Sequence, residues 1–178
     1  VKEGAATDTY ALTLAARPSS DVTIELQPDE QVAVDPSTLT FTASDWKQPR
    51  IVTVRAVQDD VAETDVHTAV IRHSVRTTAA GWAGATIPDL GVRVMDDDTS
   101  AISFEATGGS TRVTEGGAGD TVRMVLTTRP TGTVEVRASA DRLLTISGSL
   151  TFDASNWSTP RTLTIGAVDD EDAQGEHI

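Results

Sequence analysis

The eight residues Leu39-Thr40-Phe41-Thr42-Ala43-Ser44-Asp45-Trp46 recur 111 positions later as Leu150-Thr151-Phe152-Asp153-Ala154-Ser155-Asn156-Trp157. In both copies two apolar side chains alternate with Thr before a short polar stretch that ends in Trp. Strict alternation places apolar side chains on one face of a β-strand, and Asp or Asn near Ser is typical of a turn. The stretch therefore predicts a strand followed by a turn, and its recurrence predicts a tandem repeat.

The repeat extends in both directions from this stretch. Before it, Val1-Lys2-Glu3-Gly4 matches Val113-Thr114-Glu115-Gly116, and after it Ala56–Asp60 matches Ala167–Glu171. The offset is 112 residues in the early part and 111 in the later part, so one deletion near residues 138 to 140 accounts for the difference. The strand-like run 101–105 has no counterpart before Val1, and the second copy ends before a counterpart of 68–94. We expect two repeats, 1–98 and 99–178, each truncated at one end of the chain, in a longer protein.

The apolar pattern between the turns has a period of two residues, and no window keeps a helical period over three turns. Pro, Gly, Asp and Ser separate short runs of five to nine residues. This pattern predicts an all-β fold of antiparallel sandwiches. In the first copy the alternating apolar positions are Tyr10, Leu12, Leu14, Val22, Ile24, Leu26, Leu39, Phe41, Val52, Val54, Ala56, Ala69, Ile71, Leu90, Val92 and Val94.

The chain is strongly acidic, with 27 Asp and Glu against 14 Lys and Arg and a net charge of -13. This charge repels nucleic acids and anionic membrane surfaces and favours cations as partners. No apolar stretch approaches the roughly 18 residues of a membrane span, so we expect no membrane insertion. The absence of cysteine excludes disulfides and thiolate metal sites. A cysteine-free β protein outside the cell would need another means of stabilisation, and a metal ion is one.

The triplet Asp96-Asp97-Asp98 stands between two alternating apolar runs. Two like charges about 4 Å apart repel by roughly 4 kcal/mol at a protein surface. Such a run is usually a solvated linker, and the alternative is a group of carboxylates around a cation. Acidic residues recur at matching places in the two copies, and this recurrence favours the cation.

No catalytic constellation accompanies the acidic residues. His73 is in phase with Ala69 and Ile71 on an expected strand, which is typical of a packed histidine, and no Gly-x-Ser-x-Gly motif is present. Glycoside hydrolysis needs a carboxyl group in an apolar cleft, whereas these acids lie in polar loops. We expect no enzyme activity. Trp46 and Trp157 are expected to cover the core beside their turns, with a sugar-stacking platform as the alternative. Trp82 is either an exposed contact or a buried anchor.

The combination of Val-x-Glu-Gly, Leu-Thr-Phe, Trp-x-x-Pro-Arg and Val-x-Val-x-Asp-Asp-Asp resembles the Calx-β domain, and in particular its repeats in bacterial surface proteins. The resemblance covers almost the whole chain in two copies. It implies a seven-stranded immunoglobulin-like sandwich that binds Ca²⁺ at one end. By position, the implied ligands of the first copy are Glu3, Glu30, Asp59, Asp60, Glu63, Asp96, Asp97 and Asp98. Those of the second are Glu115, Asp141, Asp169, Asp170 and Asp172.

The implied site departs from the family pattern at two positions. Gln58 stands where the family often has an acid, and Gln174 stands where the first copy has Glu63. For the further ligand before the Leu-Thr-Phe strand, Asp29, Glu30 and Asp35 are all available. Glu30 is preferred because it matches Asp141.

These observations predict a Ca²⁺-binding structural repeat of an extracellular or cell-surface protein such as an adhesin or filament. Calcium would rigidify the repeat and its junction with the next. The expected partners are neighbouring repeats of the same chain, with possible association into fibres. One alternative is a module that binds a surface glycan or protein through Trp82 and the loops. Another is an accessory domain of a secreted hydrolase.

Overall fold

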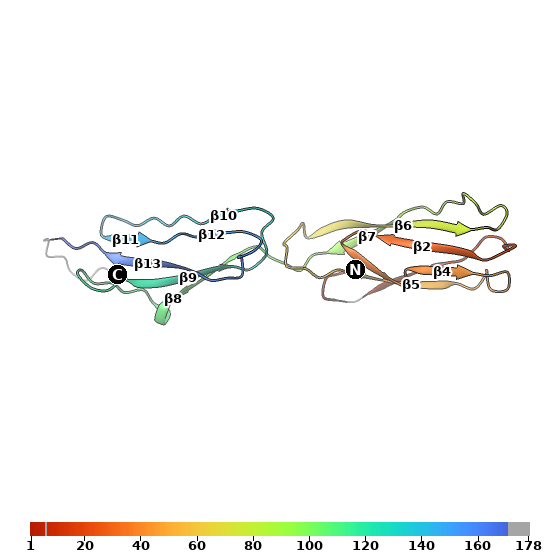
Figure 1. The fold of residues 1–178 in the computed structure, drawn as a ribbon. Helices are drawn as coiled ribbons and strands as arrows, with labels where there is room; N and C mark the ends of the chain where they lie inside the picture. Colours follow the sequence, from red (N-terminus) through yellow and green to blue (C-terminus); the bar gives the residue numbers. More distant parts are fainter. Residues whose placement is uncertain (6, 171–178) are drawn as a thin grey trace. The chain divides into compact units, whose positions relative to one another are not determined.

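The computed structural model describes residues 1–5 and 7–170. Within these residues the chain is all-β, without an α-helix, and its strands form antiparallel sheets in a sandwich-like arrangement (Figure 1). The only helical element in this part of the chain is the short 3₁₀ turn η1 (Thr107–Gly109). The contacts divide the chain into two compact units. The first contains Val1–Asp59 and Glu63–Asp97, and the second contains Asp60–Ala62 and the residues from Asp98 onward.

The first unit consists of a four-stranded and a three-stranded sheet (Figure 1). The four-stranded sheet has the order β4 (Thr38–Phe41), β2 (Val22–Pro28), β6 (Val66–Thr77) and β7 (Leu90–Met95). The three-stranded sheet has the order β1 (Asp8–Leu12), β5 (Arg50–Ala56) and β3 (Val32–Asp35). Every strand pair is antiparallel, with Ile24 opposite both Leu39 and Val75. The predicted fold class is confirmed.

The alternating apolar side chains form the core of the first unit. Val22, Phe41 and Val52 are completely buried, and Ile24, Leu39 and Val54 are nearly so. Burial of one such side chain contributes about 1.5–3 kcal/mol relative to its exposed state. Tyr10, Leu12, Leu90 and Val92 pack against this core from positions that are partly exposed. The predicted apolar faces are therefore the faces that the two sheets turn toward each other.

The second unit repeats part of this arrangement. One sheet has the order β11 (Leu144–Ser147), β13 (Arg161–Ala167), β9 (Asp120–Leu126) and β8 (Ile102–Ala106), and β10 (Val134–Glu135) pairs with β12 (Thr151–Phe152). Leu126, Leu150, Phe152 and Leu163 form a smaller buried cluster. No strand of the described second unit corresponds to β6 or β7. Phe104 on β8 is 61% exposed and Ile102 is 46% exposed.

The recurring turn has the same bonds in both units. The backbone N–H of Thr42 donates to Oδ1 of Asp45 (2.7 Å), and that of Asp153 donates to Oδ1 of Asn156 (3.1 Å). The carbonyl oxygen of Trp46 accepts from the N–H of Leu14, as that of Trp157 does from Leu126, both at 3.1 Å. Both Trp side chains pack against their cores, as predicted.

Candidate metal centre

Four carboxylates gather beside the end of β7. Strand pairing brings them together, because Lys2 forms a parallel bridge with Met95 and the N–H of Glu3 donates to the carbonyl oxygen of Met95 (3.1 Å). The segment that holds Glu3 is thereby fixed beside the end of β7, and the chain continues from Met95 directly into the acidic triplet. One carboxylate oxygen from each of four residues lies within 4.8 Å of the other three; these residues are Glu3, Asp96, Asp97 and Asp98.

Glu3 is the buried member of this group, with only 2% of its surface exposed. Burial raises the pKa of Glu3 above its ordinary value of 4.5, and the negative charges of Asp59, Asp96 and Asp97 raise it further. The backbone N–H of Asp59, which donates to Oε2 of Glu3 at 3.4 Å, acts in the opposite direction. The folded chain therefore holds this carboxylate in a place where a negative charge is unfavourable without a cation.

A glycine and a glutamine complete the wall of the site. Gly4 has a φ of +58°, in the left-handed region that favours glycine. A Cβ atom at Gly4 would lie 2.9 Å from Oε1 of Gln58. The amide of Gln58 donates to Oδ1 of Asp97 at 3.4 Å. Gly4 thus permits the close approach of a side chain that hydrogen-bonds a candidate ligand.

Four of the predicted ligands of the first copy lie outside the group of four. Glu63 donates its backbone N–H to Oδ2 of Asp96 (2.6 Å), but its carboxylate accepts from Nε2 of Gln31 (2.9 Å) and lies 3.3 Å from Nε2 of His67. Asp59 lies beside the group: its backbone N–H donates to Glu3, and its negative charge raises the pKa of Glu3. Asp60 accepts a backbone hydrogen bond from Arg129 through its carbonyl oxygen, and Glu30 is exposed in the turn between β2 and β3.

The predicted ligands of the second copy form no comparable group in the described part of the chain. Asp141 accepts from the N–H of Leu143 (2.9 Å). Gly116, after Glu115, has a φ of +63°, and Oδ1 of Asp169 lies 4.0 Å from the place of a Cβ on this glycine. The turn of the first site is therefore reproduced, with Asp169 at the position of Gln58. Asp170 follows in the chain, and Asp172 lies outside the described residues.

The donor set fits a hard divalent cation. Ca²⁺ takes six to eight oxygen ligands at about 2.3–2.6 Å and accepts irregular geometry. Zn²⁺ prefers nitrogen or sulfur ligands, and the group of four contains neither His nor Cys. Carboxylates from Glu3 and the triplet, together with backbone carbonyls or water, can supply such a coordination sphere.

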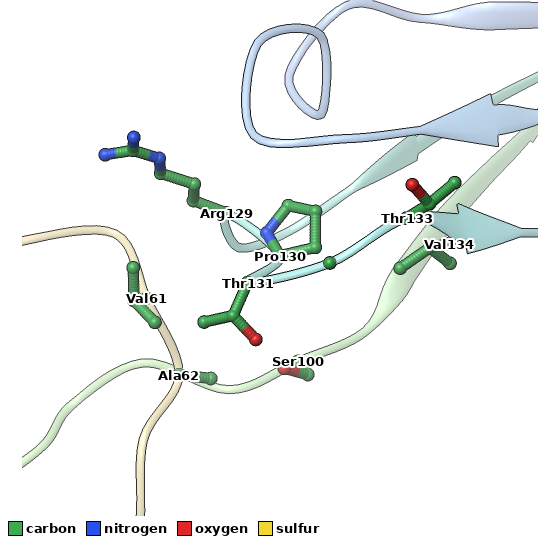
Figure 2. A pocket seen from close by; sticks show the side chains of 9 residues that line it. Val61, Ala62, Ser100, Arg129, Pro130, Thr131, Thr133 and Val134 are labelled. Carbon is green, nitrogen blue, oxygen red and sulfur yellow. The ribbon is translucent and has the colours of Figure 1, made fainter.

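A separate cavity of about 280 Å³ lies within the second unit (Figure 2). Figure 2 shows Arg129, Pro130 and Thr131 around it together with Val61, Ala62 and Ser100. Arg129 is the only ionisable residue of its lining. The cavity therefore offers no carboxylate and no histidine to a cation.

One contact near the metal centre lies beyond the residues predicted from the sequence. Gln31 contacts both Glu63 and His67, with 3.2 Å between its Oε1 and Nε2 of His67. No spacing in the sequence indicates this contact, which depends on the pairing of β3 with β5. Trp82, one of whose two interpretations was an exposed contact, is partly buried and packs against the core of the first unit. The structure thus favours the interpretation of Trp82 as an anchor in the core.

Comparisons with known proteins give only a distant likeness of fold. No family model matches the chain, and no curated protein is similar to it in sequence. Among solved structures, the Calx-β structure of CBD12 from CALX1.2 has 17% identity and a TM-score of 0.39, over 98% of this chain and 72% of that one. The CsuC–CsuE chaperone–tip adhesion subunit complex of Csu pili from Acinetobacter baumannii has 7% identity and a TM-score of 0.33, over 98% and 85%. A protein of unknown function from Porphyromonas gingivalis W83 has 13% identity and a TM-score of 0.31, over 95% and 77%.

No helix in the described residues is long and apolar enough to span a bilayer.

Proposed function

We propose that this chain is a calcium-binding structural module of a larger extracellular or cell-surface protein, such as an adhesin or surface filament. The observation that carries the proposal is the convergence of Glu3, Asp96, Asp97 and Asp98 within 4.8 Å, with Glu3 buried. Close carboxylates with a buried member are unfavourable alone and favourable around a divalent cation.

The ion would connect two segments that are far apart in the sequence. Glu3 lies at the start of the first unit, and Asp96 and Asp97 lie at its last described residues, after β7. A ligand that binds only the folded state at a hundred times its Kd adds about 2.7 kcal/mol of stability. Calcium would therefore hold the beginning and the end of the first unit together.

Extracellular calcium suits such a site. Modules outside the cell bind Ca²⁺ with a Kd of about 0.1–1 mM, which millimolar calcium fills. The chain has no cysteine and so no disulfide to supply the same stabilisation. A bound ion would supply this stabilisation, and we place the module outside the cell, with neighbouring repeats of the same protein as its partners.

Calorimetry and thermal unfolding of the full chain test the proposal. We expect saturable heat on titration with CaCl₂ and a higher midpoint in calcium than in chelator. Asp97→Asn should weaken both effects, because it removes one charge from the group of four. Asp21→Asn is the matched control, because Asp21 is exposed in the same unit and outside the group. Equal melting of the native chain in calcium and in chelator would refute the proposal.

A further inference from the structure

The recurring turn of the second unit carries a modification motif that the first unit lacks. Asn156-Trp157-Ser158 has the spacing Asn-x-Ser, with a residue other than Pro in the middle. Asparagine in this pattern is the acceptor of N-linked sugars on surface loops of secreted proteins. At the same places the first copy has Asp45 and Lys47. Asn156 is the only asparagine of the chain, so the sequence offers one position for this modification.

The turn itself forms with either residue. Oδ1 of Asn156 accepts the backbone N–H of Asp153 (3.1 Å), and Oδ1 of Asp45 accepts that of Thr42 (2.7 Å). In the second unit the carbonyl oxygen of Asp153 also accepts the backbone N–H groups of Asn156 (3.2 Å) and Trp157 (3.1 Å). A carboxylate oxygen therefore serves this turn as well as an amide oxygen does, and the backbone does not require asparagine here.

The amide lacks an ion pair that the acid makes. In the first unit, Oδ2 of Asp45 lies 2.6 Å from Nη2 of Arg50. Arg161 holds the place of Arg50 in the second repeat. The charge of Asp153 interacts with Arg161, yet the buried Nε of Arg161 has no hydrogen-bond partner among the described residues. A buried donor in this state costs about 1–3 kcal/mol. The neutral side chain of Asn156 is thus not explained by the stability of the turn.

The nitrogen of the Asn156 side chain is accessible. Because Oδ1 accepts the N–H of Asp153, Nδ2 is the other atom of the amide, and it donates no hydrogen bond within the described part of the chain. Asn156 is half-buried, and its Nδ2 is not among the unpartnered atoms that are shielded from solvent. Ser155 and Ser158 on either side are exposed. An enzyme can therefore reach both the amide nitrogen and the hydroxyl group two residues later.

We propose that Asn156 is the acceptor of an N-linked sugar. The donor is a sugar with a diphosphate leaving group on its anomeric carbon. Nδ2 attacks this carbon, so that the nitrogen–carbon bond forms and the carbon–oxygen bond to the diphosphate breaks. The diphosphate leaves with the electron pair, and a base of the transferase takes the Nδ2 proton. Oδ1 is not consumed, so the bond from Asp153 and the turn persist after the reaction.

The hydroxyl group of Ser158 has a separate role. An amide nitrogen is a weak nucleophile because its lone pair is delocalised into the carbonyl group. The transfer therefore needs an enzyme, and the hydroxyl two residues after the asparagine is the part of the motif by which the enzyme selects its acceptor. This inference is independent of calcium, because neither Asn156 nor Ser158 belongs to the group of four carboxylates.

The direct test offers the full chain two donors. In one arm the folded chain is incubated with a soluble N-glycosyltransferase and UDP-glucose. In the other, the chain is secreted behind a cleavable leader by cells that carry an oligosaccharyltransferase and its lipid diphosphate donor. We expect the intact mass to increase by one hexose or by one oligosaccharide, and peptide sequencing to place the sugar on Asn156. Modification in either arm supports the proposal and identifies the donor, whereas an unmodified chain in both arms would overturn it.

Matched variants separate the motif from the turn. Ser158→Ala should abolish the mass increase and Ser158→Thr should retain it, with unchanged melting temperatures because Ser158 is exposed. In the first unit, Asp45→Asn supplies the amide without the hydroxyl, and Asp45→Asn with Lys47→Ser supplies both. Only the double variant should gain a second sugar. A sugar that persists in Ser158→Ala, or that appears on the single Asp45→Asn variant, would contradict the proposal.

Discussion

The backbone N–H of Asp59 donates to Oε2 of Glu3, with 3.4 Å between the two atoms. This bond lowers the pKa of Glu3, whereas burial and the charges of Asp59, Asp96 and Asp97 raise it, burial most of all. The folded state therefore binds the Glu3 proton more tightly than the unfolded state does. By linkage, this carboxyl group lowers stability as the pH rises from about 4.5 through its folded pKa.

Glu3→Gln should have opposite effects with and without calcium. In chelator at pH 7, we expect the variant to be more stable than the native chain, because a neutral amide avoids the cost of a buried charge. Below pH 4.5 the difference should shrink, since Glu3 is then mostly protonated in both states. In calcium at a hundred times the native Kd, the native chain gains about 2.7 kcal/mol of stability from the bound ion. The variant should largely lack this gain. Urea unfolding at both pH values, with and without calcium, measures all three effects.

Calcium affinity should increase with pH across the titration of Glu3. The ion binds the deprotonated carboxylate, so binding below the raised pKa of Glu3 must release a proton. Calorimetry in two buffers of different ionisation enthalpy measures the number of protons released. The apparent Kd should fall as the pH rises from about 4.5 through the raised pKa of Glu3, whereas a Kd that does not change with pH would exclude Glu3 as a ligand.

Gln58→Asp introduces the acid that the second unit has at the same position, Asp169. The new carboxylate would face Asp97, to which the Gln58 amide now donates at 3.4 Å. We expect a lower melting temperature in chelator because of charge repulsion, and a Kd for calcium about tenfold lower, or about 1.4 kcal/mol. Gln27→Asp, on β2, is the control for the added charge. Weaker calcium binding by the Gln58 variant would show that the amide is preferable at this place.

Phe41→Ala should destabilise the first unit by about 3–5 kcal/mol, because Phe41 is completely buried in the larger core. The matched substitution Phe152→Ala should cost less, because only three other buried residues surround Phe152 in its cluster and the site can collapse more easily. Urea unfolding of variants that retain only Trp46 or only Trp157 reports each unit separately. A larger loss for Phe152→Ala would contradict this order.

Asp45→Asn should be tolerated far better than Asp45→Ala. The side chain accepts the N–H of Thr42, and Asn156 makes the equivalent bond in the second unit. The bond from the Thr42 N–H is the largest of the influences that lower the pKa of Asp45, and Arg50 contributes further. The stability that the charged Asp45 carboxylate contributes is present above the unfolded pKa of Asp45. It is lost as the pH falls through the lowered pKa of Asp45 in the folded state. The melting temperature of Asp45→Asn should therefore depend less on pH below about 4 than that of the native chain.

The regular part of the fold could be predicted because alternation carries the information directly. Tyr10, Val52 and Ile71 are in phase with their neighbours, and the structure places all three in strands whose apolar faces meet. The strand β3 was not predicted, because only Val32 and Val34 alternate within its four residues. Its existence depends on pairing with β5, which a local pattern does not contain.

The candidate site was predicted in part for a similar reason. Glu3 and the triplet converge because the N-terminal segment pairs with β7, and the repeated motifs indicate that these residues belong together. The direction of the Glu63 carboxylate, by contrast, depends on Gln31 and His67. Gln31 lies in the turn before β3 and His67 lies on β6, and their contacts with the Glu63 carboxylate direct it away from the group of four. Position in a repeat indicates which loop a residue occupies, but its hydrogen-bond partners decide where the side chain points.

Phe104 and Ile102 on β8 are exposed in the described chain, and we expect its association in solution to depend on salt. Phe104 and Ile102 would adhere to similar surfaces, while a net charge of -13 keeps molecules apart. The range of that repulsion falls from about 30 Å at 0.01 M salt to about 8 Å at 0.15 M. Dilute buffers should therefore favour monodisperse samples, and concentrated salt should promote clustering through β8.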